Sequence, residues 1–295
     1  MRHAAAILLA CFVTPAVAQI APIRLPDGAT WTITAEHTRR AEGAGQAQNW
    51  SLTTVKRLTW HAGGNGKPNT LTVTPVSAVP GAGSSPEVAI GRSLAIPAVL
   101  VVDQSLTPGD VVNRDEVRAE FRRLVPSAPK DSTDLIDAAT KAMIASELVI
   151  ASRAQGLELQ LKKPRSAEIG MPNPLGGQPL RATEIVQVEA VDIKNGRAVV
   201  KWRQALDPES FKASAAAILT TMAQGKVEPA KIEAARAAFA TASMINETEC
   251  FYEIDLPTGL ARRGECFVDF AVNLSGKTQK ASDHWVISQT MPGAS

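Results

Sequence analysis

Two stretches near the C-terminus alternate apolar and polar residues, and they constrain the fold more than any other part of the sequence. Within 249–255 and 265–274, apolar residues recur at every second position, the period of strands with one buried side. Between the two stretches, Pro257 and Gly259 supply the chemistry of a turn. The sequence therefore predicts an antiparallel hairpin, followed by a third strand over 280–290.

Two cysteines lie on the apolar side of this predicted hairpin. A turn centred on Thr258 places Cys250 directly opposite Cys266, with both side chains toward the core. We therefore predict a disulfide between Cys250 and Cys266, the only site residues that the sequence assigns. The alternative is a pair of free, buried thiols. A catalytic pair is disfavoured because redox cysteines usually lie close in sequence, as in Cys-x-x-Cys.

The N-terminus has the pattern of a secretory signal peptide. Arg2 gives a positive start, residues 4–13 are apolar, and Ala16 and Ala18 are small, so we predict cleavage after Ala18. This localises the protein to the periplasm or the extracellular space, and its Ala-rich composition favours a bacterial periplasm. A lipoprotein anchored through Cys11 is the disfavoured alternative, because only ten residues would precede the lipid.

Composition limits the classes of partner. Removing 18 of the 295 residues leaves 277, and loss of Arg2 lowers the formal net charge of +2 by one. A nearly neutral chain gives no reason to expect nucleic acid as a partner. Beyond the signal no apolar run approaches the roughly 20 residues of a membrane helix, so no transmembrane segment is expected.

The remaining patterns predict an α+β fold with a mostly antiparallel, curved β-sheet and two helix pairs packed on one face. Short alternating segments between 31 and 103 predict strands, and Asn195-Gly196 is typical of a hairpin turn. Capping residues and apolar stripes predict helices over 113–125, 132–155, 207–224 and 229–244.

The expected organisation is a signal peptide over 1–18, a β-sheet and helix pair over 19–164, a Pro- and Gly-rich loop over 165–180, and a second helix pair with the disulfide-closed sheet over 181–295. The two halves are compatible with a single domain. A duplicated β-α-α-β unit is one hypothesis, because Gln104, Leu106 and Pro108 recur 100 residues later. The alternative is that strand-to-helix connections in general tend to carry such residues, without any duplication.

No motif for catalysis, a cofactor or a metal emerges, so we assign no catalytic, cofactor-binding or metal-binding residue. His37, His61 and His284 are dispersed, and no His-Glu-x-x-His or Cys-x-x-Cys occurs. The Ser127-to-Lys130 spacing resembles a penicillin-binding motif, but Pro129 breaks the helix that the motif needs. The tryptophans fall in predicted strands, either as core or as a ligand platform; they are Trp31, Trp50, Trp60, Trp202 and Trp285.

These features favour a non-catalytic binding or carrier protein of the cell envelope for an apolar small molecule or lipid. In outline, a curved sheet covered by helices is similar to the half-barrel lipoprotein carriers of the bacterial periplasm. The resemblance is one of layout and implies no residue roles. One alternative is a structural or assembly factor that binds another envelope protein. The other is an enzyme without a recognisable motif.

Overall fold

The computed structural model describes most of the chain downstream of the predicted signal peptide. The described residues are 19–20, 23–43, 48–64, 66–83, 96–124, 133–157, 159–171, 173, 178–224, 228–240, 242–274 and 277–291. The predicted signal peptide, with Cys11 and the cleavage site, lies outside them, as does the Ser127-to-Lys130 spacing.

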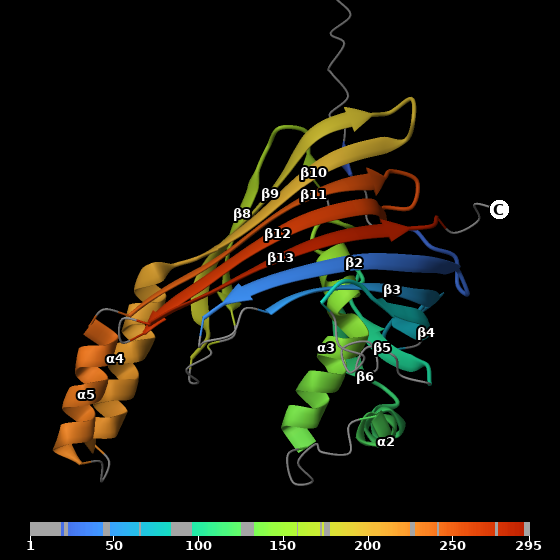
Figure 1. The fold of residues 1–295 in the computed structure, drawn as a ribbon. Helices are drawn as coiled ribbons and strands as arrows, with labels where there is room; N and C mark the ends of the chain where they lie inside the picture. Colours follow the sequence, from blue (N-terminus) through green and yellow to red (C-terminus); the bar gives the residue numbers. More distant parts are fainter. Residues whose placement is uncertain are drawn as a thin grey trace, which may run out of the picture.

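Eleven antiparallel strands form one curved sheet in the order β6-β5-β4-β3-β2-β13-β12-β11-β10-β9-β8 (Figure 1). Strands β2 and β13, from opposite ends of the described chain, pair at its centre. The strands are β2 (Thr30–Glu42), β3 (Gln48–His61), β4 (Thr70–Pro80), β5 (Ala98–Val102), β6 (Pro108–Val111), β8 (Arg165–Met171), β9 (Leu180–Asp192), β10 (Arg197–Leu206), β11 (Ser243–Asp255), β12 (Ala261–Leu274) and β13 (Lys277–Gln289). A separate pair joins β1 (Gln19–Ile20) to β7 (Leu159–Gln160).

Two helix pairs lie on the same side of the arched sheet (Figure 1). They are α2 (Arg114–Leu124) with α3 (Thr133–Ser152), and α4 (Pro208–Gln224) with α5 (Pro229–Ala240). The predicted fold class is therefore confirmed. We call the helix-covered side of the sheet its inner face, and the opposite side its outer face.

The predicted hairpin register is observed. Cys250 on β11 faces Cys266 on β12, and the pairing continues from Ser243 to the turn, with one irregularity between Glu253 and Ile254. Gly259 has a φ of 74°, a left-handed conformation that a residue without Cβ adopts freely. Local alternation and turn chemistry were therefore sufficient to set this register.

The Asn195-Gly196 hairpin also forms, although its turn is longer than a two-residue turn. Asp192 pairs with Arg197, so four residues connect β9 and β10. Gly196 alone among these four has a positive φ, of 63°. Asp192 accepts hydrogen bonds from the backbone and side-chain nitrogens of Asn195, which lowers the pKa of this carboxyl.

Two boundaries differ from the sequence prediction. The segment predicted as a loop over 165–180 contains β8, an exposed edge strand that pairs only with β9. Backbone hydrogen bonds define such a strand, so its side chains need no apolar alternation. The helix predicted over 229–244 ends earlier, at Ala240. Met244, which the prediction placed in the helix, is a buried residue of strand β11.

The two β-α-α-β segments share an order of elements but differ in space. Strands β10 and β11, which flank α4 and α5, are neighbours in the sheet. In the first segment, β5 lies in the large sheet, whereas β7, the strand that follows α3, pairs with β1 in the separate two-stranded sheet. The segments therefore occupy positions that are not equivalent.

The main core lies between the inner face and α3. One continuous row across the sheet is buried throughout, comprising Val186, Trp202, Cys250, Cys266, Trp285, His37 and Leu52. A smaller cluster packs α4 against the same face at the ends of β9–β11, through Leu180, Leu206, Phe211, Ala242 and Met244. Two helices thus cover the inner face at separate places.

Candidate functional site

A buried ion pair fixes α3 to the inner face. The side chains of Lys56 on β3 and Glu147 on α3 are 3% and 1% exposed, and their charged groups are in contact. Lys56 also donates to the backbone carbonyls of Met143 and Ile144, at 3.0 and 2.9 Å, and Thr54 donates to Glu147. A charge can be buried in a core only when it is paired and hydrogen-bonded in this way.

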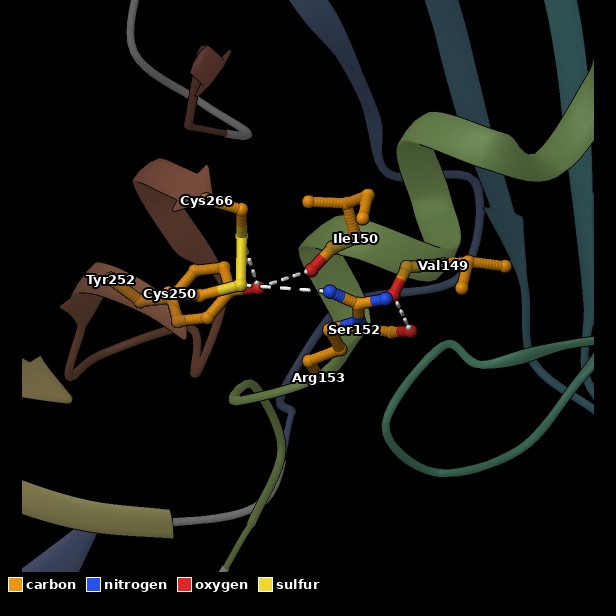
Figure 2. The surroundings of a disulfide bond; sticks show 7 residues. All are labelled: Val149, Ile150, Ser152, Arg153, Cys250, Tyr252 and Cys266. Atoms are coloured by element: carbon orange, nitrogen blue, oxygen red, sulfur yellow. Dashed lines mark hydrogen bonds between the residues drawn. A yellow bond between two sulfur atoms is a disulfide. The ribbon is translucent and has the colours of Figure 1, made fainter. Parts of the chain in front are cut away.

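The end of α3 lies against the cysteine pair (Figure 2). The Sγ atoms of Cys250 and Cys266 are 2.10 Å apart, at disulfide distance. The hydroxyl of Tyr252 donates to the carbonyl of Ile150 at 2.6 Å and lies 3.2 Å from the Cys266 sulfur. Burial raises the pKa of the Tyr252 phenol above its ordinary value of 10.0, an effect that the charge of Arg153 partly offsets.

Arg153, the first residue after α3, directs its guanidinium onto the same part of the sheet. Its Cζ lies 4.5 Å from the centroid of the Trp202 ring, and one nitrogen lies 3.6 Å from the Cys250 sulfur. Burial lowers the pKa of Arg153, while Tyr252 and Glu184 act in the opposite direction. Among the described residues, no carboxylate lies within ion-pair distance of this guanidinium, and the buried indole N–H of Trp202 has no hydrogen-bond partner.

A second polar cluster joins β2 and β13. The Nε2 atom of His37 is 2.7 Å from one carboxylate oxygen of Asp283, and Arg39 donates to the other oxygen at 3.3 Å. The ring of Trp285 stacks on His37 with centroids 3.6 Å apart, and Trp50 approaches its edge at 4.7 Å. Asp283 and two indoles therefore fix the imidazole in place.

Between the parts covered by α3 and α4, two rows of the inner face are only partly covered. We call these rows the central strip. They contain mostly half-buried side chains and run side by side, the first row from β10 and the second from β11, across β12, β13 and β2 to β3. The first row is Gln204, Thr248, Val268, Asp283, Arg39 and Trp50, and the second is Asn246, Phe270, Ala281, Ala41 and Gln48.

A hollow of about 280 Å³ lies at the β2–β13 part of the central strip. Phe270, Ala41 and Ala281 supply apolar lining, and the polar and charged lining comes from Arg39, Glu42, Gln48, Gln279 and Lys280. The volume is close to the lower end of the range typical of ligand pockets. A lining that mixes apolar and charged groups suits an amphipathic small molecule.

The described acid–base pair beside the strip is His37 with Asp283, and Trp285 and Trp50 enclose its imidazole. No three described His, Cys, Asp or Glu side chains are grouped so as to hold a metal ion. What the strip offers chemically is a partly open surface of mixed apolar and polar side chains, with the cation Arg39 within it and the cation Arg153 at its border.

The structure separates the three histidines. His37 is buried in the row that borders the strip, whereas His61 is half-exposed at the end of β3. His284 lies on the outer face as predicted, where it stacks on Phe267 and pairs with Glu265 at 2.9 Å. Four of the tryptophans are buried, and Trp50 is the half-buried exception.

Sequence reasoning missed the three charged groups that organise the inner face. Lys56 interrupts an otherwise apolar strand face, and this was the one visible signal of a buried partner. Arg153 follows a helix and Arg39 lies in a polar run, so neither stands out in the sequence. In the described part of the chain, no helix combines the length and hydrophobicity of a membrane span.

Comparisons with known proteins give no family. No protein-family model matches the sequence, and no curated protein matches it. The structure of DynF from the dynemicin biosynthesis pathway of Micromonospora chersina aligns with 94% of this chain and 86% of its own, at 6% identity and a TM-score of 0.22. Similarity at that level carries no argument about fold or function.

Proposed function

We propose that this protein is a non-catalytic binding or carrier protein for an amphipathic small molecule, held on the central strip. The observation that carries the proposal is the partly open strip between two covered parts of one sheet face, with a hollow lined by both apolar and charged side chains. Apolar surface that remains uncovered within a folded chain commonly marks a binding site.

The proposal includes export and oxidation of the chain. Its support is the signal-like pattern of residues 1–18 and the disulfide distance between Cys250 and Cys266. Mass spectrometry of protein recovered from the periplasm of a bacterial host tests this. We expect a chain that begins at Gln19 and lacks two thiol hydrogens. A reduced chain that retains residues 1–18 would contradict the proposal.

Ligand carriage is tested by native mass spectrometry of that same protein and by titration with dodecanol. We expect a noncovalent adduct, and saturable quenching of tryptophan fluorescence by dodecanol. The Ala281→Trp variant fills the hollow opposite Phe270 and should lose both signals. The matched control is Ser282→Trp, which adds the same bulk to the outer face of the same strand.

Two results would remove the carrier function. One is the absence of any adduct and of dodecanol binding in the unaltered protein. The other is equal binding by the Ala281→Trp variant, provided that its circular dichroism shows a folded chain. Loss of binding in Ser282→Trp alone would move the site to the outer face and would also contradict the proposal.

The alternative of an assembly factor rests on the outer face. Large apolar side chains are exposed there, but charged neighbours cover part of them, as Lys201 covers the ring of Phe251 at 5.1 Å. Ion pairs such as Lys201 with Glu249 run across the same surface. We therefore give precedence to the inner face.

A further inference from the structure

We propose that the ligand of the central strip is a single-chain carboxylate, and that its acid group binds between the Arg153 guanidinium and the indole N–H of Trp202. This inference rests on the proposed carrier function and names its class of ligand. An unsatisfied indole N–H and a guanidinium with no carboxylate partner, placed together on the inner face, carry it.

The first donor is a cation that lacks a counter-ion. Lys56 forms an ion pair with Glu147, and Arg39 forms one with Asp283. Among the described residues, the Arg153 guanidinium has the Trp202 ring and the Cys250 sulfur as its ring and hydrogen-bond partners. Glu184, the carboxylate whose charge acts on it, is bonded to Arg165. A half-buried charge without a counter-ion is costly, and an incoming anion removes that cost.

The second donor is the indole N–H of Trp202. This side chain is 1% exposed, and its nitrogen has no partner among the described residues. Buried indole nitrogens usually find an acceptor, because an unmade hydrogen bond costs free energy. The guanidinium stacks over the same ring, so one carboxylate can accept from both groups.

The location explains the need for an alkyl chain. Trp202 belongs to the buried row that borders the central strip, and Gln204 and Thr248 of the strip come next. Phe270 is two strands and four residues away from Trp202, a span of roughly 16 Å. A chain bound at Arg153 therefore runs across Thr248 and Val268 toward the hollow lined by Phe270 and Ala281.

Arg39 and Lys280 both line the hollow, and Arg39 is the competing cation on the inner face. Its side chain is 40% exposed and already donates to Asp283. Solvent screening and the existing carboxylate both weaken its attraction for a second anion. Arg153 has neither of these limitations.

The test compares dodecanoate, dodecanol and acetate by calorimetric titration of the full chain at constant ionic strength. We expect dodecanoate to bind at least about tenfold more tightly than dodecanol, as charge-assisted hydrogen bonds require. Acetate should bind weakly, because it lacks the chain. The Arg153→Met variant should lose the preference for the acid while it still binds dodecanol. Trp202→Phe should lose part of that preference.

Arg203→Met is the matched control, because Arg203 lies on the same strand as Trp202 and on the outer face. A preference for the acid that survives Arg153→Met, or that disappears only in Arg39→Met, overturns this inference and leaves the carrier function standing. Failure of both dodecanol and dodecanoate to bind the unaltered protein overturns the carrier function itself. Tight acetate binding would show a small-anion site and would also overturn the inference.

Discussion

Lys56 of β3 and Glu147 of α3 form an ion pair that is almost fully buried between the sheet and the helix. The residues are 91 apart in sequence, and the Lys56 ammonium also reaches two carbonyls of α3. This pair fixes how α3 covers the inner face, and therefore where the covered part ends and the central strip begins.

Replacement of Lys56 by Met should lower the free energy of unfolding by about 3–5 kcal/mol, because it leaves the Glu147 charge buried without its partner. Urea unfolding followed by tryptophan fluorescence measures this loss. The double variant Lys56→Met/Glu147→Met should recover most of it. Lys201→Met breaks a half-exposed pair with Glu249 on the outer face and should cost less than about 1 kcal/mol. Equal costs for the two single variants would contradict the role assigned to Lys56.

Removal of the cysteine pair should destabilise the fold by roughly 3 kcal/mol, since the bridge closes a loop with a sequence separation of 16 residues. Urea unfolding measures the free energy of unfolding of the unaltered protein and of the double variant Cys250→Ser/Cys266→Ser. The reductant dithiothreitol should shift the unfolding midpoint of the unaltered protein and leave that of the variant unchanged. The disulfide would be contradicted if both cysteines react fully with a thiol reagent when protein made in an oxidising compartment is unfolded without reductant.

Tyr252 should make stability fall in alkaline solution. Burial raises its folded pKa above the unfolded value of 10.0, so its contribution is complete below about pH 10 and decreases as the pH rises beyond it. Tyr252 is the only tyrosine in the chain, so tyrosinate absorbance reports on it alone. We expect ionisation near pH 10 in urea and well above it in the folded protein. Coincident titrations would refute the prediction.

Gly264→Ala should destabilise the hairpin by about 1–3 kcal/mol through overpacking. Gly264 faces Tyr252 across the strands, and a Cβ at this position would lie 2.8 Å from two atoms of the ring. Thermal unfolding measures the loss, and near-ultraviolet circular dichroism should show a displaced Tyr252. Gly64→Ala is the control, because a Cβ there meets no atom within 4 Å. Unchanged stability in Gly264→Ala would mean that the ring moves without cost.

Local patterns predicted the parts of the fold that depend on neighbouring residues. The register of β11 and β12 follows from one turn and an alternation, and α4 begins at Pro208 as its capping sequence predicts. The edge strand β8 was missed, because it exposes most of its side chains and therefore lacks the apolar period that marks a half-buried strand.

The sequence by itself determined the fold class, the facing positions of Cys250 and Cys266, and which side of several long strands, β11 and β12 among them, faces inward, because side-chain alternation and turn chemistry act over short distances. Only the tertiary structure decided the candidate site. Pairing of β2 with β13 brings His37 to Asp283 across 246 residues, and packing of α3 brings Arg153 to Trp202. Contacts of this kind depend on how distant elements pack together, and no local pattern of residues in the sequence indicates that packing.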